Sequence, residues 1–360
     1  MVHDPVPMPR AIANLHVKSA RALIPPSELV KELPLSEAAA ETVATARDEV
    51  CQLIDGRDRR LVVVGPCSIH DVGMAKEYAD YLMGERRRLS RHLLILMRVY
   101  FEKPRTSLGW KGLINDPHLD GSYDMETGLR IGRSLLRDLA ERGMPAASEV
   151  LDPISPQYLG ELISWAAIGA RTIESQTHRE MASGLSMPIG FKNGTDGTLQ
   201  SALNAMKSAR QSHHFLGVDP DGRVATIATT GNKDTHLVLR GGVAGPNFEE
   251  SHVRAATEAL RGLSLCPRVM VDCSHDNSSK DYSRQPEVAS ALAVQLRHGV
   301  DLLGVMIESN LVAGKQAFPP ASGQALRYGQ SITDGCVDLT TTTRMLNELA
   351  EAVDLKPAAA

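Results

Sequence analysis

Polar residues able to bind anions or a metal ion follow the apolar runs of this sequence. Four of them are cations, and four others offer a thiolate, an imidazole and two carboxylates. A chain with a net charge of −4 would not bury four cations without compensating anions, so the pattern predicts phosphate or carboxylate ligands. In chain order the residues are Cys67, Arg98, Glu149, Arg171, Lys192, Arg240, His275 and Glu308.

A metal site is predicted from the mixed donors in this set. Cys67 supplies sulfur, His275 nitrogen and Glu308 oxygen. Asp334, in the segment SITDGC, adds a second carboxylate shortly after the last predicted strand. Such donors suit one divalent ion of the Mn, Fe, Co or Zn class better than Mg or Ca.

The segment FEKPRT predicts a second anion site. Lys103, Arg105 and Thr106 follow a strand and can close on a phosphate. Pro104 would fix the loop and so lower the entropy cost of binding.

Short apolar runs alternate with amphipathic segments, as is typical of βαβ units. Strands that are apolar on both faces favour a closed (β/α)8 TIM barrel, with an open doubly wound sheet as the alternative. In a barrel, catalytic groups stand at the carboxyl ends of the strands, where the polar residues above fall. Strands are predicted at 61–65, 93–99, 145–149, 169–173, 188–192, 236–240, 268–272 and 302–307, and helices at 36–54, 74–89, 128–142, 156–165, 199–210, 249–261 and 286–297.

Two segments lie outside this repeat. Residues 1–55, which are rich in proline at the start, are expected to form an N-terminal arm and helix at an interface or regulatory site, and 56–355 the catalytic barrel. Asp-Pro-Asp-Gly joins two β-rich stretches, which predicts an inserted β-hairpin at about 213–230. No G-x-G-x-x-G follows the first strand, so dinucleotide binding is not expected.

The composition excludes several classes of protein. The chain has 360 residues, 42% of them hydrophobic, as in ordinary globular proteins. It has no global basic field, so no nucleic acid or membrane partner is expected, and no apolar run reaches the ~18 residues of a membrane span. Five cysteines without paired spacing fit reduced thiols in the cytoplasm.

Several long segments carry a family resemblance. In chain order they are GPCSIHD, MRVYFEKPRTSLGWKGLINDPHLDGSYD, SPQYLGELISWAAIGARTIESQTHREMASGLSMPIGFKNGTDG, LRGG, VDCSHDNSSKDY, GVMIESN and SITD. Over about residues 20–350 the sequence closely resembles the type I 3-deoxy-D-arabino-heptulosonate 7-phosphate (DAHP) synthases. The resemblance implies a barrel with an N-terminal extension and an added hairpin. It also implies a metal-dependent condensation of phosphoenolpyruvate with erythrose 4-phosphate and water to DAHP and phosphate, the first step of the shikimate pathway.

The resemblance also assigns roles by position. Lys103, between the two substrates, is the candidate to protonate the nascent alkoxide, with His275 or metal-bound water as alternatives. Glu149 is also predicted to bind substrate, because it stands at the end of a predicted strand. The metal ligands are Cys67, His275, Glu308 and Asp334; the phosphoenolpyruvate residues are Arg98, Lys103, Arg171, Lys192 and Arg240; the erythrose 4-phosphate residues are Lys103, Pro104, Arg105 and Thr106.

Regulation and assembly are implied as well. Members of the family are usually inhibited by one aromatic amino acid, here expected near Asp152, Pro156, Gln157 and Ser186. The sequences LDPISPQYLG and SQTHREMASGLSMP most resemble those of the tyrosine-sensitive isoenzymes. A homo-dimer or tetramer is expected, with the N-terminal arm across a subunit interface.

Two positions depart from the family pattern. Asp276 follows His275 where Gly or Ala is usual, and it would weaken anion binding or alter metal preference. Lys315 and Gln316 replace a common Asn-Gln pair and are expected to be peripheral.

The sequence leaves two alternative functions. The first is the related synthase that uses arabinose 5-phosphate, against which the KPRT loop argues. The second is a catalytically silent barrel that senses aromatic amino acids, against which the complete set of ligands and cations argues.

Overall fold

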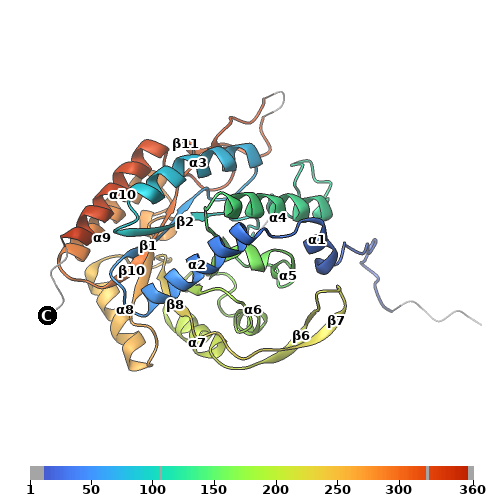
Figure 1. Ribbon diagram of the computed structural model, residues 1–360, viewed down its shortest axis with the longest axis horizontal. Coiled ribbons are helices and arrows are strands. Elements are labelled where there is room, and N and C mark those ends of the chain that lie inside the picture. Colours follow the sequence, from blue (N-terminus) through green and yellow to red (C-terminus); the bar gives the residue numbers. More distant parts are fainter. Residues whose placement is uncertain (1–11, 106–107, 322–323, 356–360) are drawn as a thin grey trace, which may run out of the picture.

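The computed structural model describes residues 12–105, 108–321 and 324–355 (Figure 1). Parallel strands close into a barrel in the order β1-β10-β9-β8-β5-β4-β3-β2, and helices surround it. The predicted TIM barrel is therefore confirmed, and the open sheet is excluded. The strands are β1 Arg60–Gly65, β2 Leu93–Arg98, β3 Ala146–Glu149, β4 Ile163–Ile168, β5 Ile189–Lys192, β6 His214–Val218, β7 Val224–Ala228, β8 Thr235–Leu239, β9 Val269–Asp272, β10 Leu302–Glu308, β11 Val312–Lys315 and β12 Gln330–Ser331.

The helices that follow the barrel strands lie on its outer side (Figure 1). α2 begins as predicted after Ser36, whose hydroxyl oxygen accepts a hydrogen bond from the backbone N–H of Ala39 at 3.2 Å. No helix within the described ranges has the length and apolarity needed to cross a membrane. The helices are α1 Pro26–Glu32, α2 Glu37–Ile54, α3 Val72–Arg88, α4 Met125–Glu141, α5 Pro156–Leu159, α6 Gln176–Ala182, α7 Gln200–Ala209, α8 Glu250–Gly262, α9 Gln285–Arg297 and α10 Leu339–Asp354, with 3₁₀ turns η1 Gly160–Leu162, η2 His275–Ser278 and η3 Tyr282–Arg284.

The fourth barrel strand lies earlier in the chain than predicted. β4 spans Ile163–Ile168, whereas the predicted strand 169–173 is largely a turn. The predicted helix 156–165 is wrong, because it divides into α5, η1 and the start of β4. The run ISWAAI is apolar throughout, and so short a run has no period that separates a buried strand from a buried helix. Parallel pairing with β3 and β5 on its two sides makes it a strand.

Three helices were not predicted. α1 and α6 have 7 residues each, too few for a helical period to stand out from the surrounding chain. α10 follows the last strand and packs against α9, with buried Met345 and Leu349 among its contacts with the core.

The inserted hairpin is confirmed. β6 and β7 pair antiparallel from His214 opposite Ala228 to Val218 opposite Val224. The N-terminal extension meets the tip of this hairpin, where the backbone N–H of Ser27 donates to the carbonyl of Pro220 at 2.7 Å. Figure 1 shows α1 beside this tip.

The interior of the barrel is filled by side chains. Trp165 on β4 is fully buried there and donates from Nε1 to Nε2 of His236 on β8 at 2.9 Å. Gly190 on β5 makes room for the indole, since a Cβ at this position would lie 2.3 Å from Trp165. The closed interior leaves only the ends of the barrel for binding ligands.

Candidate active site

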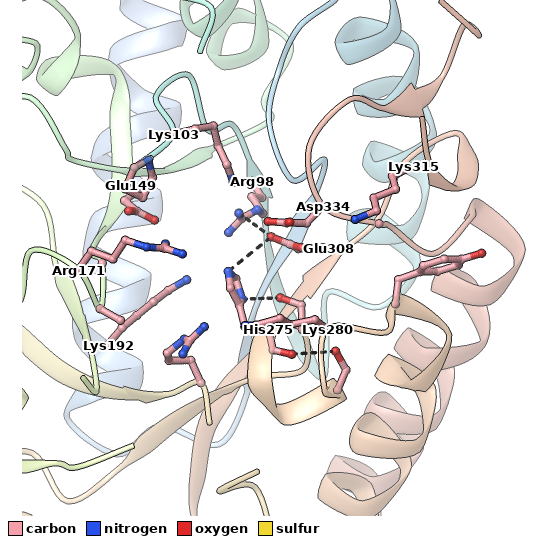
Figure 2. Close-up of a pocket in the computed structure, with 18 of the residues that line it drawn as sticks. Arg98, Lys103, Glu149, Arg171, Lys192, His275, Lys280, Glu308, Lys315 and Asp334 are labelled. Carbon is pink, nitrogen blue, oxygen red and sulfur yellow. Dashed lines mark hydrogen bonds and ion pairs between the residues drawn. The ribbon is translucent and has the colours of Figure 1, made fainter. Parts of the chain in front are cut away.

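A cavity of about 290 Å³ opens at the carboxyl ends of the barrel strands. Figure 2 shows Arg171 and Lys192 on one side of it, Glu308 and Asp334 on the other, and His275 between them. Thr106 lies outside the described residues. The predicted site residues that line the cavity are Arg98, Lys103, Pro104, Arg105, Glu149, Arg171, Lys192, Arg240, His275, Glu308 and Asp334.

Three of the predicted metal ligands form a close group. One ligand atom each from Cys67, Glu308 and Asp334 lies within 4.8 Å of the others. The Cys67 thiol is buried, and its sulfur lies 3.5 Å from Oδ2 of Asp334. A group of one sulfur and two carboxylates fits a borderline divalent ion rather than Mg or Ca.

The fourth predicted ligand, His275, approaches this group from β9. Its Nε2 lies 4.0 Å from Oε1 of Glu308. Its Nδ1 lies 2.9 Å from the carboxylate of Asp272 and 2.7 Å from the hydroxyl of Ser274. A carboxylate on one ring nitrogen orients the imidazole and leaves the other nitrogen to face a metal ion.

Lys103 is a buried cation in direct contact with this group. Its ammonium donates to the Cys67 sulfur at 3.0 Å. Burial, followed by the charge of Glu308, raises the pKa of the Cys67 thiol to about 11. Although desolvation favours a neutral Asp334, the nearby Lys103 and His275 hold the pKa of that carboxyl below its usual value. The negative charge of the group therefore lies on its two carboxylates, with the buried ammonium of Lys103 beside the thiol.

The other cations differ in how the protein itself holds them. Arg98 donates to Glu308 at 2.9 Å, and its guanidinium lies 3.5 Å from the centre of the Tyr100 ring. Lys192 donates to Asp272 at 3.1 Å. Arg171 is exposed in the turn after β4 and makes no hydrogen bond or ion pair with another described residue. Of these three cations it is therefore the most available to an incoming anion.

Asp272 and Tyr100 belong to the site but were not among the predicted residues. Asp272 is fully buried at the end of β9, where its carboxylate pairs with Lys192 and His275. Burial alone would raise the pKa of this carboxyl, but His275 and Lys192 hold it well below its usual value. The strand-end position that selected Glu149 and Glu308 also selects Asp272, so the signal was present. Tyr100 gave no such signal, because an aromatic residue after a strand is typical of a core.

A family model for the DAHP synthetase I family matches residues 34–347. The chain belongs to this family. It is 50% identical over 341 residues to the Tyr-sensitive phospho-2-dehydro-3-deoxyheptonate aldolase of Escherichia coli (strain K12), covering 94% of this chain and 95% of that relative.

A second relative and a solved structure carry the same enzyme name. The Phe-sensitive phospho-2-dehydro-3-deoxyheptonate aldolase of the same strain is 51% identical over 342 residues, covering 94% of this chain and 97% of the relative. A solved structure of phospho-2-dehydro-3-deoxyheptonate aldolase from Francisella tularensis SCHU S4 has a TM-score of 0.92 and 51% identity, covering 95% of this chain and 100% of that chain. The predicted enzyme of the DAHP synthase family is thereby confirmed.

The residues predicted to bind the effector lie away from the main cavity. Asp152 accepts a hydrogen bond from the N–H of Ile154 at 2.7 Å and so shapes the turn before α5. Pro156 and Gln157 begin α5. Ser186 borders a separate wide cleft that also includes 227–234. Their shared role in this DAHP synthetase I chain stays a prediction.

The two departures from the family pattern both reach the cavity. Asp276 forms an ion pair with Arg240, which lines the cavity. Lys315 is itself a lining residue and lies near Asp334 (Figure 2). The expectation that Lys315 is peripheral is wrong, because β11 carries it back over the mouth of the barrel.

Proposed function

We propose that this chain condenses phosphoenolpyruvate with D-erythrose 4-phosphate and water to give DAHP and inorganic phosphate, using one divalent metal ion. One observation carries the proposal. Glu308 and Asp334 from the close group line the same cavity as the unpaired cation Arg171, and the third member, Cys67, is buried behind them. A metal group beside cations is the arrangement that a reaction between two phosphorylated substrates requires.

Phosphoenolpyruvate brings a phosphate and a carboxylate into the cavity. Arg98, Lys103, Arg171, Lys192 and Arg240 are the proposed binding residues, and all of them line it. Fixed cations offset the cost of removing a multiply charged anion from water.

The proposed metal ligands are Cys67, His275, Glu308 and Asp334. Their sulfur, nitrogen and oxygen donors fit Mn, Fe, Co or Zn. When bound, such an ion supplies Lewis acidity toward the aldehyde oxygen of erythrose 4-phosphate. Asp272 would hold His275 in the orientation that this role needs.

The loop after β2 is the proposed site for erythrose 4-phosphate. Lys103, Pro104 and Arg105 line the cavity. Arg105 is anchored by a hydrogen bond from Nε to the carbonyl of Trp110 at 2.8 Å, which leaves its terminal nitrogens for a phosphate. Thr106, also predicted here, is outside the described residues.

Lys103 is the proposed general acid. In the reaction, C3 of phosphoenolpyruvate attacks the aldehyde carbon, its double-bond electrons form the new C–C bond, and the aldehyde oxygen takes up a proton. Water then adds at C2, and the bond between C2 and the phosphate oxygen breaks with its electrons leaving on the phosphate, so that C2 becomes a carbonyl carbon. Of the two protons that the water loses, one restores Lys103 and the other leaves on the inorganic phosphate. Burial favours a neutral amine, but Cys67 and Glu308 outweigh it and raise the pKa of Lys103, so a proton is available at neutral pH. A positioned acid contributes roughly 10²- to 10⁴-fold to rate.

We further propose feedback inhibition by an aromatic amino acid, with tyrosine favoured, at Asp152, Pro156, Gln157 and Ser186. The Tyr-sensitive and Phe-sensitive relatives support such regulation. The N-terminal extension is proposed to join subunits into a homo-dimer or tetramer. The cysteines are all free, which supports a reducing cytoplasm.

The test is the loss of phosphoenolpyruvate absorbance in the presence of erythrose 4-phosphate. Consumption should stop after treatment with a chelator and return with Mn²⁺. Tyrosine should then inhibit at lower concentrations than phenylalanine or tryptophan. Consumption only with arabinose 5-phosphate, or none with either sugar after Mn²⁺ is restored, would refute the proposed reaction.

A further inference from the structure

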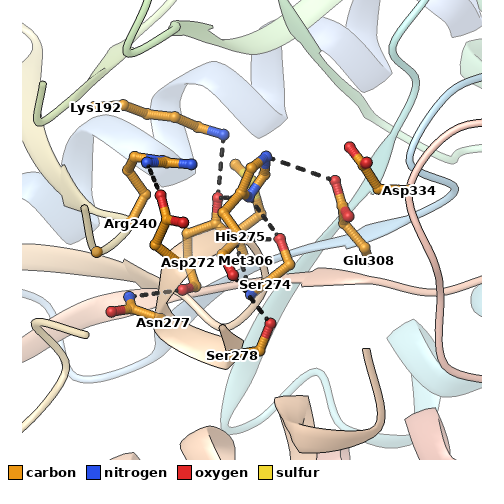
Figure 3. A network of polar contacts seen from close by, with 12 residues as sticks. Lys192, Arg240, Asp272, Ser274, His275, Asn277, Ser278, Met306, Glu308 and Asp334 are labelled. Carbon is orange, nitrogen blue, oxygen red and sulfur yellow. Dashed lines mark hydrogen bonds and ion pairs between the residues drawn. The ribbon is translucent and has the colours of Figure 1, made fainter. Parts of the chain in front are cut away.

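Arg240 already has an anionic partner inside the protein. Nη1 of Arg240 donates to Oδ2 of Asp276, and the two side chains are only 6% and 18% exposed. Figure 3 shows Arg240 with a dashed line from its guanidinium to a carboxylate. Arg240 also lines the cavity in which two phosphorylated substrates are proposed to bind. One carboxylate and any phosphate that binds there must therefore share this guanidinium.

Asp276 differs from the other carboxylates that pair with cavity cations. Asp272 holds Lys192, but it also orients His275 and accepts two hydrogen bonds from Ser274. Glu308, which holds Arg98, belongs to the proposed metal group. These two carboxylates serve several neighbours at once.

Asp276 has no comparable second task among the described residues. Besides Arg240, the only described side chain that forms an ion pair with its carboxylate is Lys280, whose ammonium lies 3.5 Å away and is 76% exposed. Its carboxylate is therefore in effect a counterion dedicated to Arg240.

The main chain on both sides of this pair is fixed independently of it. Asn193 accepts a hydrogen bond from the backbone N–H of Arg240 at 2.8 Å. Asn277, next to Asp276, accepts from the N–H of Asn247 at 2.8 Å. All three asparagines are buried. Removing the Asp276 carboxylate would thus release the guanidinium without moving its backbone.

We propose that Asp276 is an internal competitor for Arg240 that sets the affinity of the cavity for phosphate groups. This inference rests on the proposed function for its substrate, phosphoenolpyruvate, but not for the competition itself. The guanidinium has five N–H donors, so it can still bind a phosphate, but Asp276 neutralises its charge at close range. The carboxylate weakens binding of the substrate and of the inorganic phosphate product, and so favours product release.

Asp276→Asn tests the competition most directly, since the amide keeps the volume of the side chain and removes its charge. Isothermal titration of the Mn²⁺-loaded protein with inorganic phosphate should give a Kd about tenfold lower than in the wild type. Asp276→Ala should change Kd in the same direction. Glu287→Gln is the matched control, because it removes one exposed carboxylate outside the cavity lining and should leave Kd unchanged.

Steady-state kinetics separate competition from a role in positioning Arg240. Competition predicts that the KM for phosphoenolpyruvate falls about tenfold in Asp276→Asn while kcat stays the same or falls as phosphate release slows. If Asp276 instead positions Arg240, both variants would bind phosphate more weakly and KM would rise. Unchanged or weaker phosphate binding in both variants would overturn the proposal.

The titration also distinguishes this inference from the proposed reaction. Tighter phosphate binding in a protein that does not consume phosphoenolpyruvate would support the competition and refute the reaction. Consumption of phosphoenolpyruvate with no change in phosphate affinity would do the reverse.

Discussion

At the amino-terminal end of the barrel, Arg60 and Arg268 are buried near the end of α2, while at the carboxyl end Arg171 and Arg240 face a cavity of about 290 Å³. Both ends gather guanidinium groups and carboxylates. At the amino-terminal end, Asp301 lies 3.3 Å from Arg60 and 3.0 Å from Arg268.

The two ends differ in what lies in front of the terminal nitrogens of their arginines. Arg60 donates to the carbonyl of Asp58 at 2.6 Å, and Arg268 donates to the carbonyls of Leu53 and Arg57. The void beside Arg60 is only about 10 Å³, too small for a ligand. Arg60 and Arg268 thus close the amino-terminal end of the barrel. At the carboxyl end, a cavity lies in front of Arg171 and Arg240. Residue type alone does not separate the two uses.

Cysteines at the two ends provide the largest expected contrast. Cys67→Ala should lower the Mn²⁺-restored activity by more than about 100-fold, because it removes a proposed ligand from the metal group. Cys266→Ala, a change near the amino-terminal end of β9, should leave activity unchanged. The rate of phosphoenolpyruvate consumption at saturating Mn²⁺ measures both. Full activity in Cys67→Ala would remove the thiol from the ligand set.

The arginines should separate activity from stability. Arg171→Ala is expected to lower kcat/KM about 100-fold, since it removes a cation from the proposed phosphate site, with little effect on the free energy of unfolding. Arg268→Ala should instead lower the free energy of unfolding by roughly 2 kcal/mol while leaving the KM for phosphoenolpyruvate unchanged. Urea unfolding and steady-state kinetics on both variants check this. A loss of stability in Arg171→Ala equal to that in Arg268→Ala would break the comparison.

His236 lies in the interior between the two ends of the barrel. We expect it to have a smaller effect, on how the free energy of unfolding depends on pH. Burial lowers the pKa of this imidazole from 6.5 to about 4. Between these values the unfolded chain binds the proton and the folded chain does not, so acidification favours unfolding. This group alone should cost about 2 kcal/mol of stability between pH 7 and pH 5. His236→Gln should lose this part of the pH dependence in urea unfolding, and identical slopes in the two proteins would contradict the assignment.

Much of the site was predictable because of where strands end. Arg98, Glu149, Lys192 and Glu308 are the last residues of β2, β3, β5 and β10, so recognising each apolar run also located its polar residue. Arg171 was located despite the misplaced β4, because it lies in the turn just after the strand. Strand ends converge in a barrel whichever residues carry them there.

Pairing between distant residues was not predictable from the sequence. Arg240 and Asp276 belong to different βα loops, and nothing in the sequence indicates that their side chains meet. The sequence suggested an effect of Asp276 on anion binding but not its partner. Lys315 was judged peripheral for the same reason, since the return of β11 over the barrel depends on its long-range contacts with β12 and with Cys336.

The most direct test of the central claim is an anomalous difference map at the manganese absorption edge from a crystal soaked with Mn²⁺ and phosphoenolpyruvate. One strong peak is expected within about 2.0–2.6 Å of donor atoms from Cys67, His275, Glu308 and Asp334, with the phosphate on Arg171 and Arg240. A peak elsewhere, or a phosphate bound at Arg60 and Arg268 instead, would contradict the assignment of the carboxyl end as the catalytic end.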